Sequence, residues 1–118
     1  MSLQEISFHT EMFEKIYIVS VQGSIDSFTG EKFVETLRGI NEKGPVIINL
    51  EGVQTVSSTG IHFFKKLAEV SYTTKNIIVL VNMSQSVRYV FNSGNIQYSF
   101  HIAENEDEAV KVISRIKK

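Results

Sequence analysis

Residues 46–60 read VIINLEGVQTVSSTG, an almost continuous aliphatic run followed by three hydroxyl residues and a glycine. The run Val46–Leu50 is typical of a central strand that is covered on both faces. We expect a loop over residues 51–56 and a helix over about residues 58–71. The apolar residues at helical spacing there are Ile61, Phe64, Leu67 and Ala68. The segment therefore predicts a buried strand, a short loop and a helix that opens with hydroxyl groups.

The residues before this segment predict a hairpin and a helix. Residues 15–22, KIYIVSVQ, are rich in β-branched and aromatic side chains and predict a strand, and residues 5–10 predict a shorter one. Residues 11–14 suit the hairpin turn between them. Asp26 or Ser27 can cap a helix that runs to about residue 40. Its apolar positions are Phe28, Phe33, Val34, Leu37 and Ile40.

The residues after it repeat the alternation of strand and helix. We expect a buried strand at 76–81, a helix at 85–92 capped by Ser84, a short strand at 97–101 and a last helix at 104–117. The predicted order is ββαβαβαβα, an α/β fold with a mostly parallel sheet and an N-terminal antiparallel hairpin. Because each crossover holds one helix, we expect the sheet to grow in one direction.

Composition excludes several classes of function. The chain has 118 residues, enough for one domain, and a formal net charge of −1, which disfavours nucleic-acid binding. It has no cysteine, so disulfides, thiolate catalysis and cysteine-bound zinc are excluded. No apolar run approaches the roughly 20 residues that span a bilayer, and the N-terminus lacks the features of a signal peptide. We therefore expect a cytoplasmic protein without membrane insertion.

The hydroxyl residues at the predicted helix start allow two interpretations. Ser57, Ser58 and Thr59 lie where backbone N–H groups have no partner within the helix, so one of them should cap it. Alternatively, one hydroxyl accepts a phosphate, which the free N–H groups and the helix dipole would accommodate. Such a phosphate would add negative charge to a neutral surface and repel a partner fitted to it.

Two short segments carry a family resemblance. Residues 19–29 read VSVQGSIDSFT, and residues 46–53 and 57–61 read VIINLEGV and SSTGI. They resemble the anti-sigma-factor antagonists, the single-domain form of the STAS (sulphate transporter and anti-sigma-factor antagonist) domain. The first is similar to that family's strand ending in Gly-x-Leu/Ile-Asp, and the second to its aliphatic strand and Asp-Ser-Ser/Ala-Gly-Leu/Ile motif. The order of elements matches, so the resemblance implies one STAS domain over residues 1–118.

The resemblance implies roles for particular residues. Ser58 stands at the family's phosphorylated serine, and Thr59 and Gly60 stand at the next two motif positions. Asp26 matches the acidic residue near the phosphorylation site. One position departs from the pattern, because Ser57 stands where the family usually has aspartate. The implied partner-binding residues are Asp26, Ser27, Ser57, Ser58, Thr59, Gly60 and His62.

The resemblance also implies a function. The unphosphorylated protein would bind an anti-sigma factor that is also a serine kinase, and so free a sigma factor. Phosphorylation of Ser58 would block this binding, and a phosphatase would restore it. The alternative is a STAS subunit that binds partners without being phosphorylated, as a scaffold or attached to a transporter.

Enzymatic and cofactor-binding alternatives have weaker support. Ser58 and His62 are four residues apart and could share a helix face, as an esterase would need, but the Gly-x-Ser-x-Gly nucleophile elbow is missing. His62 is otherwise an exposed helix residue or a partner contact. His9, His62 and His101 show no metal-ligand spacing, and the glycines form no phosphate-binding motif. We expect no enzyme activity and no cofactor.

Overall fold

The structure, a computed structural model, describes residues 6–96 and 99–116 and has a five-stranded sheet and four helices in the predicted order ββαβαβαβα. The elements are β1 (Ser7–Phe13), β2 (Ile16–Ile25), α1 (Gly30–Asn41), β3 (Val46–Val56), α2 (Ser58–Thr74), β4 (Ile78–Val81), α3 (Gln85–Gly94), β5 (His101–Ala103) and α4 (Glu106–Ile116). The predicted strand 97–101 is wrong in place, because β5 begins at its last residue; residues 97 and 98 lie outside the described residues.

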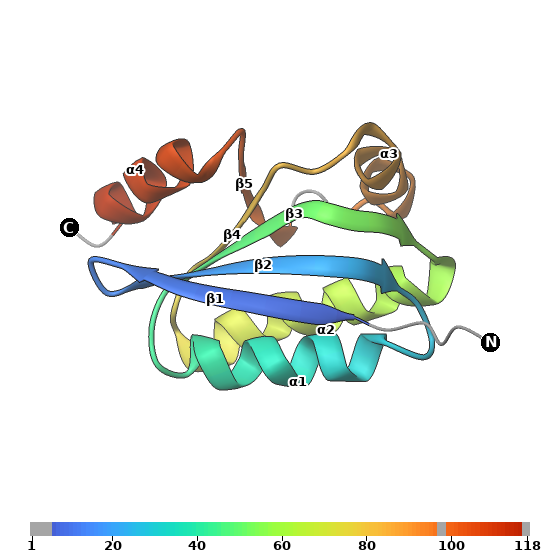
Figure 1. Ribbon diagram of the computed structural model, residues 1–118, viewed down its shortest axis with the longest axis horizontal. Helices are drawn as coiled ribbons and strands as arrows, with labels where there is room; N and C mark the ends of the chain where they lie inside the picture. The colour runs from blue at the N-terminus through green and yellow to red at the C-terminus, as the bar shows by residue number, and fades with distance from the viewer. Residues whose placement is uncertain (1–5, 97–98, 117–118) are drawn as a thin grey trace.

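The strands follow one another across the sheet in chain order, β1-β2-β3-β4-β5. The pair β1–β2 is antiparallel and the other three pairs are parallel, which confirms the predicted hairpin, the parallel sheet and its growth in one direction. Figure 1 shows α1 and α2 side by side under one face of the sheet, with α4 on the other side. The sheet is therefore covered along one face and over part of the other.

The central strand β3 carries core residues on both of its faces, as its aliphatic run predicts. Ile48 belongs to the larger core under α1, α2 and α3, and Ile47 belongs to a smaller core under α4. In the larger core the ring centroids of Phe33 and Phe64 lie 5.0 Å apart, and those of Phe64 and Phe91 lie 4.7 Å apart. These rings join α1, α2 and α3 on one side of the sheet.

The first hairpin is tighter than predicted. The pairing of β1 with β2 continues without interruption from Ser7↔Gln22 to Phe13↔Ile16, so only Glu14 and Lys15 form the turn. Both turn residues have positive φ, 50° and 71°, as a two-residue type I′ turn requires. The predicted strand end at residue 10 and the four-residue turn 11–14 are therefore wrong.

The predicted loop over residues 51–56 is also wrong, because β3 continues through it to Val56. This extension pairs with the end of β2 through Gln22↔Gly52, Gly23↔Val53 and Ile25↔Val56. The register shifts between Ser20 and Gln22 and again between Gly23 and Ile25. Gly23 has a φ of 118°, a conformation that favours glycine. The irregular ladder tolerates polar residues on its exposed side, while Val53 and Val56 still face the core.

A buried polar network ties the ends of α1 and α2 to the start of β4. The side chain of Asn41 is fully buried, and its Nδ2 donates to the carbonyl oxygens of Gly44 at 3.1 Å and Asn76 at 3.3 Å. Its Oδ1 accepts a hydrogen bond from the Thr74 hydroxyl. In return, Asn76 Nδ2 donates to the Asn41 carbonyl at 2.8 Å. One amide thus satisfies polar groups from three segments.

We expect Asn41→Ala to lower the free energy of unfolding by about 2 kcal/mol, because it leaves buried donors and acceptors without partners. Urea unfolding followed by circular dichroism measures this loss. Asn92→Ala is the matched control, since Asn92 is exposed on α3 and should change stability by less than about 0.5 kcal/mol. Equal effects of the two substitutions would contradict the role of the network.

Candidate functional site

The junction between β3 and α2 holds the predicted hydroxyl residues. Ser57 is the N-cap of α2, and its Oγ accepts a hydrogen bond from the Gly60 N–H at 3.0 Å. Its own N–H donates to the Ile25 carbonyl at 3.0 Å, at the end of β2. The structure thus assigns the capping role to Ser57, which leaves Ser58 as the first residue of the helix.

Ser58 and Thr59 are exposed, in the first turn of α2. No acidic residue lies in that turn. The positive end of the helix dipole and N–H groups without an intrahelical partner therefore lie beside the Ser58 hydroxyl. An anion carried by Ser58 would be stabilised at this place.

The Asp26 turn lies at the end of the neighbouring strand β2. One carboxylate oxygen of Asp26 accepts hydrogen bonds from the N–H groups of Phe28 at 2.8 Å and Thr29 at 3.1 Å. The Thr29 hydroxyl donates to the Ser24 carbonyl at 2.7 Å and accepts from the Asp26 N–H at 3.0 Å. These bonds hold the turn in one conformation, with the Ser27 side chain exposed.

The turn corrects the predicted start of α1. Neither Asp26 nor Ser27 is its N-cap, because the helix begins at Gly30 and its N-cap position is Thr29, without a side-chain capping bond. Phe28, which the spacing placed on the buried face of this helix, lies outside it and is 84% exposed. Asp26 instead holds the turn that leads into the helix: its carboxylate accepts from the Phe28 and Thr29 N–H groups, and its carbonyl accepts from the Gly30 N–H at 2.9 Å.

Two close approaches bring the turn and the start of α2 together. A Cβ atom on Gly60 would lie 2.3 Å from the Ile25 carbonyl oxygen, and one on Gly30 would lie 2.0 Å from the ring of Phe63. The backbone of α2 thus rests against the end of β2, while Phe63 lies over the start of α1. Both contacts are possible only because Gly60 and Gly30 have no side chain. The Asp26 turn and the start of α2 are therefore packed closely against each other.

His62 is exposed on α2, and its ring meets that of Phe63 edge-on at 5.6 Å. The Asp26 carboxylate is bound to its own turn, so it does not orient His62 as the acid of a hydrolase triad would. Within residues 6–96 and 99–116, no three histidine or acidic side chains gather closely enough to hold a metal ion. In the same residues, no helix is both long enough and apolar enough to cross a bilayer.

The candidate site combines an exposed hydroxyl, a fixed acidic turn and the exposed ring of Phe28, which the sequence analysis does not include among the candidate site residues. An aspartate two residues before an aromatic residue is the signal that could have located it, since aspartate commonly accepts the N–H two residues on.

A family model for the STAS domain matches residues 7–109, which include every element of the site. The chain belongs to the STAS domain family. No curated protein matches the chain.

Solved structures share the fold of this STAS domain at low identity. An anti-sigma factor antagonist from Mycobacterium paratuberculosis has a TM-score of 0.79 and 19% identity, covering 93% of this chain and 95% of its own. The anti-sigma factor antagonist SpoIIAA in its unphosphorylated form has a TM-score of 0.71 and 20% identity, covering 92% and 96%. A sulfate transporter family protein from Wolinella succinogenes has a TM-score of 0.75 and 17% identity, covering 92% and 93%.

Proposed function

We propose that this STAS domain is an anti-sigma-factor antagonist that is switched off by phosphorylation of Ser58. The observation that carries the proposal is the exposed Ser58 side chain in the first turn of α2, with Ser57 already capping the helix. Because the cap does not depend on Ser58, a kinase can modify this hydroxyl without disturbing the helix start. The proposed partner is an anti-sigma factor with serine kinase activity, and a phosphatase reverses the modification.

The switch follows from local electrostatics. A phosphate on Ser58 adds a charge of about −1.5 to −2 to a helix turn that has no acidic residue of its own. The dipole and the N–H groups of that turn stabilise the phosphate within the domain. A partner that covers the unmodified site would have to bury this charge, so binding is lost without a change of fold.

Ser57 takes over one task of the aspartate that the family usually has at this position. Its hydroxyl caps α2, and serine and aspartate are about equally good N-caps. The departure from the family motif therefore leaves the helix start intact. The proposed docking surface comprises the Asp26 turn with Ser27 and Phe28, the Ser57–Gly60 segment and His62.

Incubation with kinase-type anti-sigma factors from the same genome tests the switch. We expect one phosphate per chain, located by mass spectrometry at Ser58, and none on Ser58→Ala. Thr73→Ala is the matched control, because it removes an exposed hydroxyl from the last turn of the same helix, outside the docking surface, and should leave phosphorylation unchanged. Modification at other residues only, with Ser58 always bare, would reject the proposal.

Phe28→Ala should weaken partner binding by about tenfold or more, because exposed aromatic rings at the centre of an interface often dominate its affinity. Stability should hardly change, since the ring is 84% exposed. Isothermal titration calorimetry measures the affinity. Tyr72→Ala is the control: Tyr72 is 88% exposed but lies near the other end of α2. Full affinity of Phe28→Ala would remove this residue from the docking surface.

The second candidate function is a transporter-associated STAS domain that is not phosphorylated. It is favoured by the structural likeness to the sulfate transporter family protein from Wolinella succinogenes and to a murine anion transporter, Slc26a9, of which this chain covers 22%. Affinity purification distinguishes the two: transporter subunits recovered without any kinase would support this alternative.

A further inference from the structure

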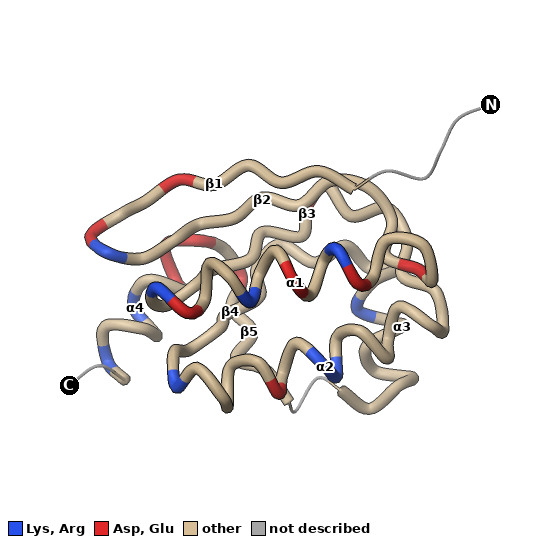
Figure 2. Tube along the Cα trace, turned by 90° about the horizontal axis from the view of Figure 1, so that it is seen from below, with Lys and Arg blue, Asp and Glu red and all other residues tan. Residues whose placement is uncertain are grey.

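The outer edge of β1 has no strand partner within residues 6–96 and 99–116. All seven residues of the strand pair with β2 in an unbroken register. Figure 2 shows β1 along the outer margin of the sheet. Exposed edges are normally blunted by proline, charged side chains or a bulge; β1 has no proline and no bulge, and Glu11 is its one acidic or basic residue besides His9. Its Met12 and Phe13 side chains are also 57% and 46% exposed.

We propose that β1 pairs antiparallel with β1 of a second copy of this chain, about a two-fold axis at Thr10. Such a pairing is isologous, so the same edge serves both copies and the assembly closes as a dimer. Thr10 is the middle residue of β1, so this axis pairs all seven residues, and any other axis shortens the ladder. The two five-stranded sheets would become one continuous sheet.

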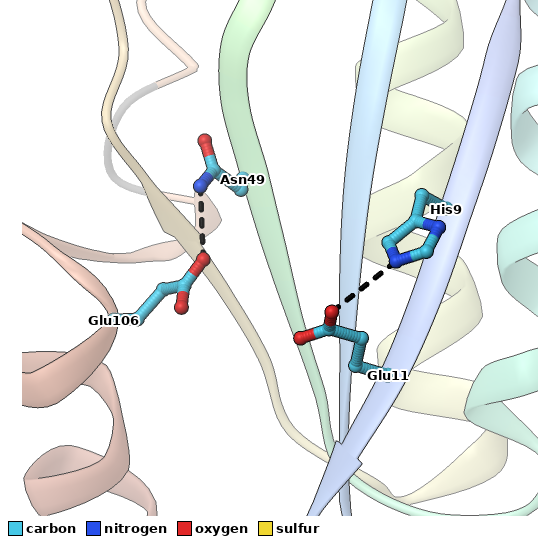
Figure 3. A network of polar contacts seen from close by, with 4 residues as sticks. All are labelled: His9, Glu11, Asn49 and Glu106. Atoms are coloured by element: carbon cyan, nitrogen blue, oxygen red, sulfur yellow. Dashed lines mark hydrogen bonds and ion pairs between the residues drawn. The ribbon is translucent and has the colours of Figure 1, made fainter.

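Complementary hydrogen-bonding side chains select this axis. His9 and Glu11 lie on the same face of β1, with His9 Nε2 3.2 Å from Glu11 Oε2 (Figure 3). An axis at Thr10 places His9 directly opposite Glu11 of the second copy, twice by symmetry. An axis at His9 or at Glu11 would instead place identical side chains opposite each other. The His9 ring and the Glu11 carboxylate can hydrogen-bond across such a pair, whereas two Glu11 carboxylates opposite each other would repel.

The other face of the strand is complementary as well. With the same axis, Met12 lies opposite Phe8 of the second copy. Phe8 packs against the larger core of its own chain, on the side of the sheet that α1 and α2 cover. Pairing would therefore extend that core and cover the exposed Met12. Burial of apolar side chains adds to the new backbone hydrogen bonds.

The dimer leaves the phosphorylation site accessible. The strand β2 separates β1 from β3, and β3 leads into Ser58. The pairing therefore does not depend on the proposed switch, and either proposal can fail alone.

Cysteine cross-linking tests the axis. The chain has no cysteine, so Thr10→Cys introduces one thiol, and two copies would carry these thiols directly opposite each other at the axis. Opposite residues of a strand pair lie within disulfide range, whereas Ser7 and its symmetry mate would be about 20 Å apart. With mild oxidant, we expect Thr10→Cys to migrate at twice 13.4 kDa on a non-reducing gel, and Ser7→Cys to stay monomeric. Equal cross-linking of the two variants, or none, overturns the proposal.

Charge reversal tests the pairing in solution. In sedimentation velocity, we expect the unmodified chain to dimerise as its concentration rises. His9→Glu should raise the dissociation constant of the dimer about tenfold or more, because two carboxylates then face each other at two places. Adding Glu11→Lys to His9→Glu should restore the dimer, since the two side chains of each pair then carry opposite charges. A monomer at every concentration, or a double variant without rescue, overturns the proposal; circular dichroism shows that each variant is folded.

Discussion

Gly60→Ala is expected to lower the free energy of unfolding by about 3 kcal/mol. The added Cβ would lie 2.3 Å from the Ile25 carbonyl oxygen and 2.9 Å from Val56 Cγ1. Overpacking usually costs about 1–3 kcal/mol, and a clash with backbone exceeds this because no rotamer change relieves it. Alanine recovers at most about 1 kcal/mol through helix propensity. The start of α2 must therefore move away from β2, which strains the Ser57 hydrogen bonds to Ile25 and Gly60.

Gly39→Ala is the control for this prediction. Gly39 lies in α1, where an added Cβ meets nothing within 4 Å. Only the helix propensity remains, so this substitution should stabilise the protein by up to about 1 kcal/mol. Thermal unfolding should show opposite shifts, with Gly60→Ala lowered by roughly 10 °C. Similar shifts for both variants would show that the contact between α2 and β2 does not constrain Gly60.

The element order could be predicted from sequence because its signals are local. The run Val46–Leu50 is aliphatic on both faces, and helical spacing marks α2. The extensions of β2 and β3 could not be predicted, because they depend on pairing between residues about 30 positions apart, such as Gln22↔Gly52. Glycine and polar residues there are typical of a loop, and only the partner strand makes them a ladder.

The site could be predicted in part. That a hydroxyl caps α2 follows from sequence, but the choice of Ser57 depends on its N–H bond to Ile25 of the neighbouring strand. The Ser58 role rests on a family resemblance and on its exposure. The spacing of Phe28 from Phe33 and Leu37 predicts a place on the helix, but the helix begins at Gly30. Phe28 lies in the turn before it, where the Asp26 carboxylate accepts hydrogen bonds from the Phe28 and Thr29 N–H groups.

Ser58→Asp is expected to weaken binding of the proposed anti-sigma-factor partner by at least about 30-fold, because a charge buried without a partner at an interface costs about 2–5 kcal/mol. The domain itself should be unchanged or slightly more stable, since a carboxylate in the first turn of α2 faces the positive end of the dipole. Calorimetric titration and urea unfolding on the same samples separate the two effects. Ser58→Ala should keep full affinity while resisting the kinase.

Thr73→Asp distinguishes a local charge effect from a general one. It adds the same charge to the exposed surface of the same helix, but in the last turn of α2. We expect it to bind the partner normally and to lose up to about 1 kcal/mol of stability, because the carboxylate now faces the negative end of the dipole. Equal loss of binding in both variants would mean that net charge controls the partner. Loss of binding in Ser58→Ala with the fold intact would make the hydroxyl itself a contact, so phosphorylation would then act by removing a hydrogen bond as well as by adding charge.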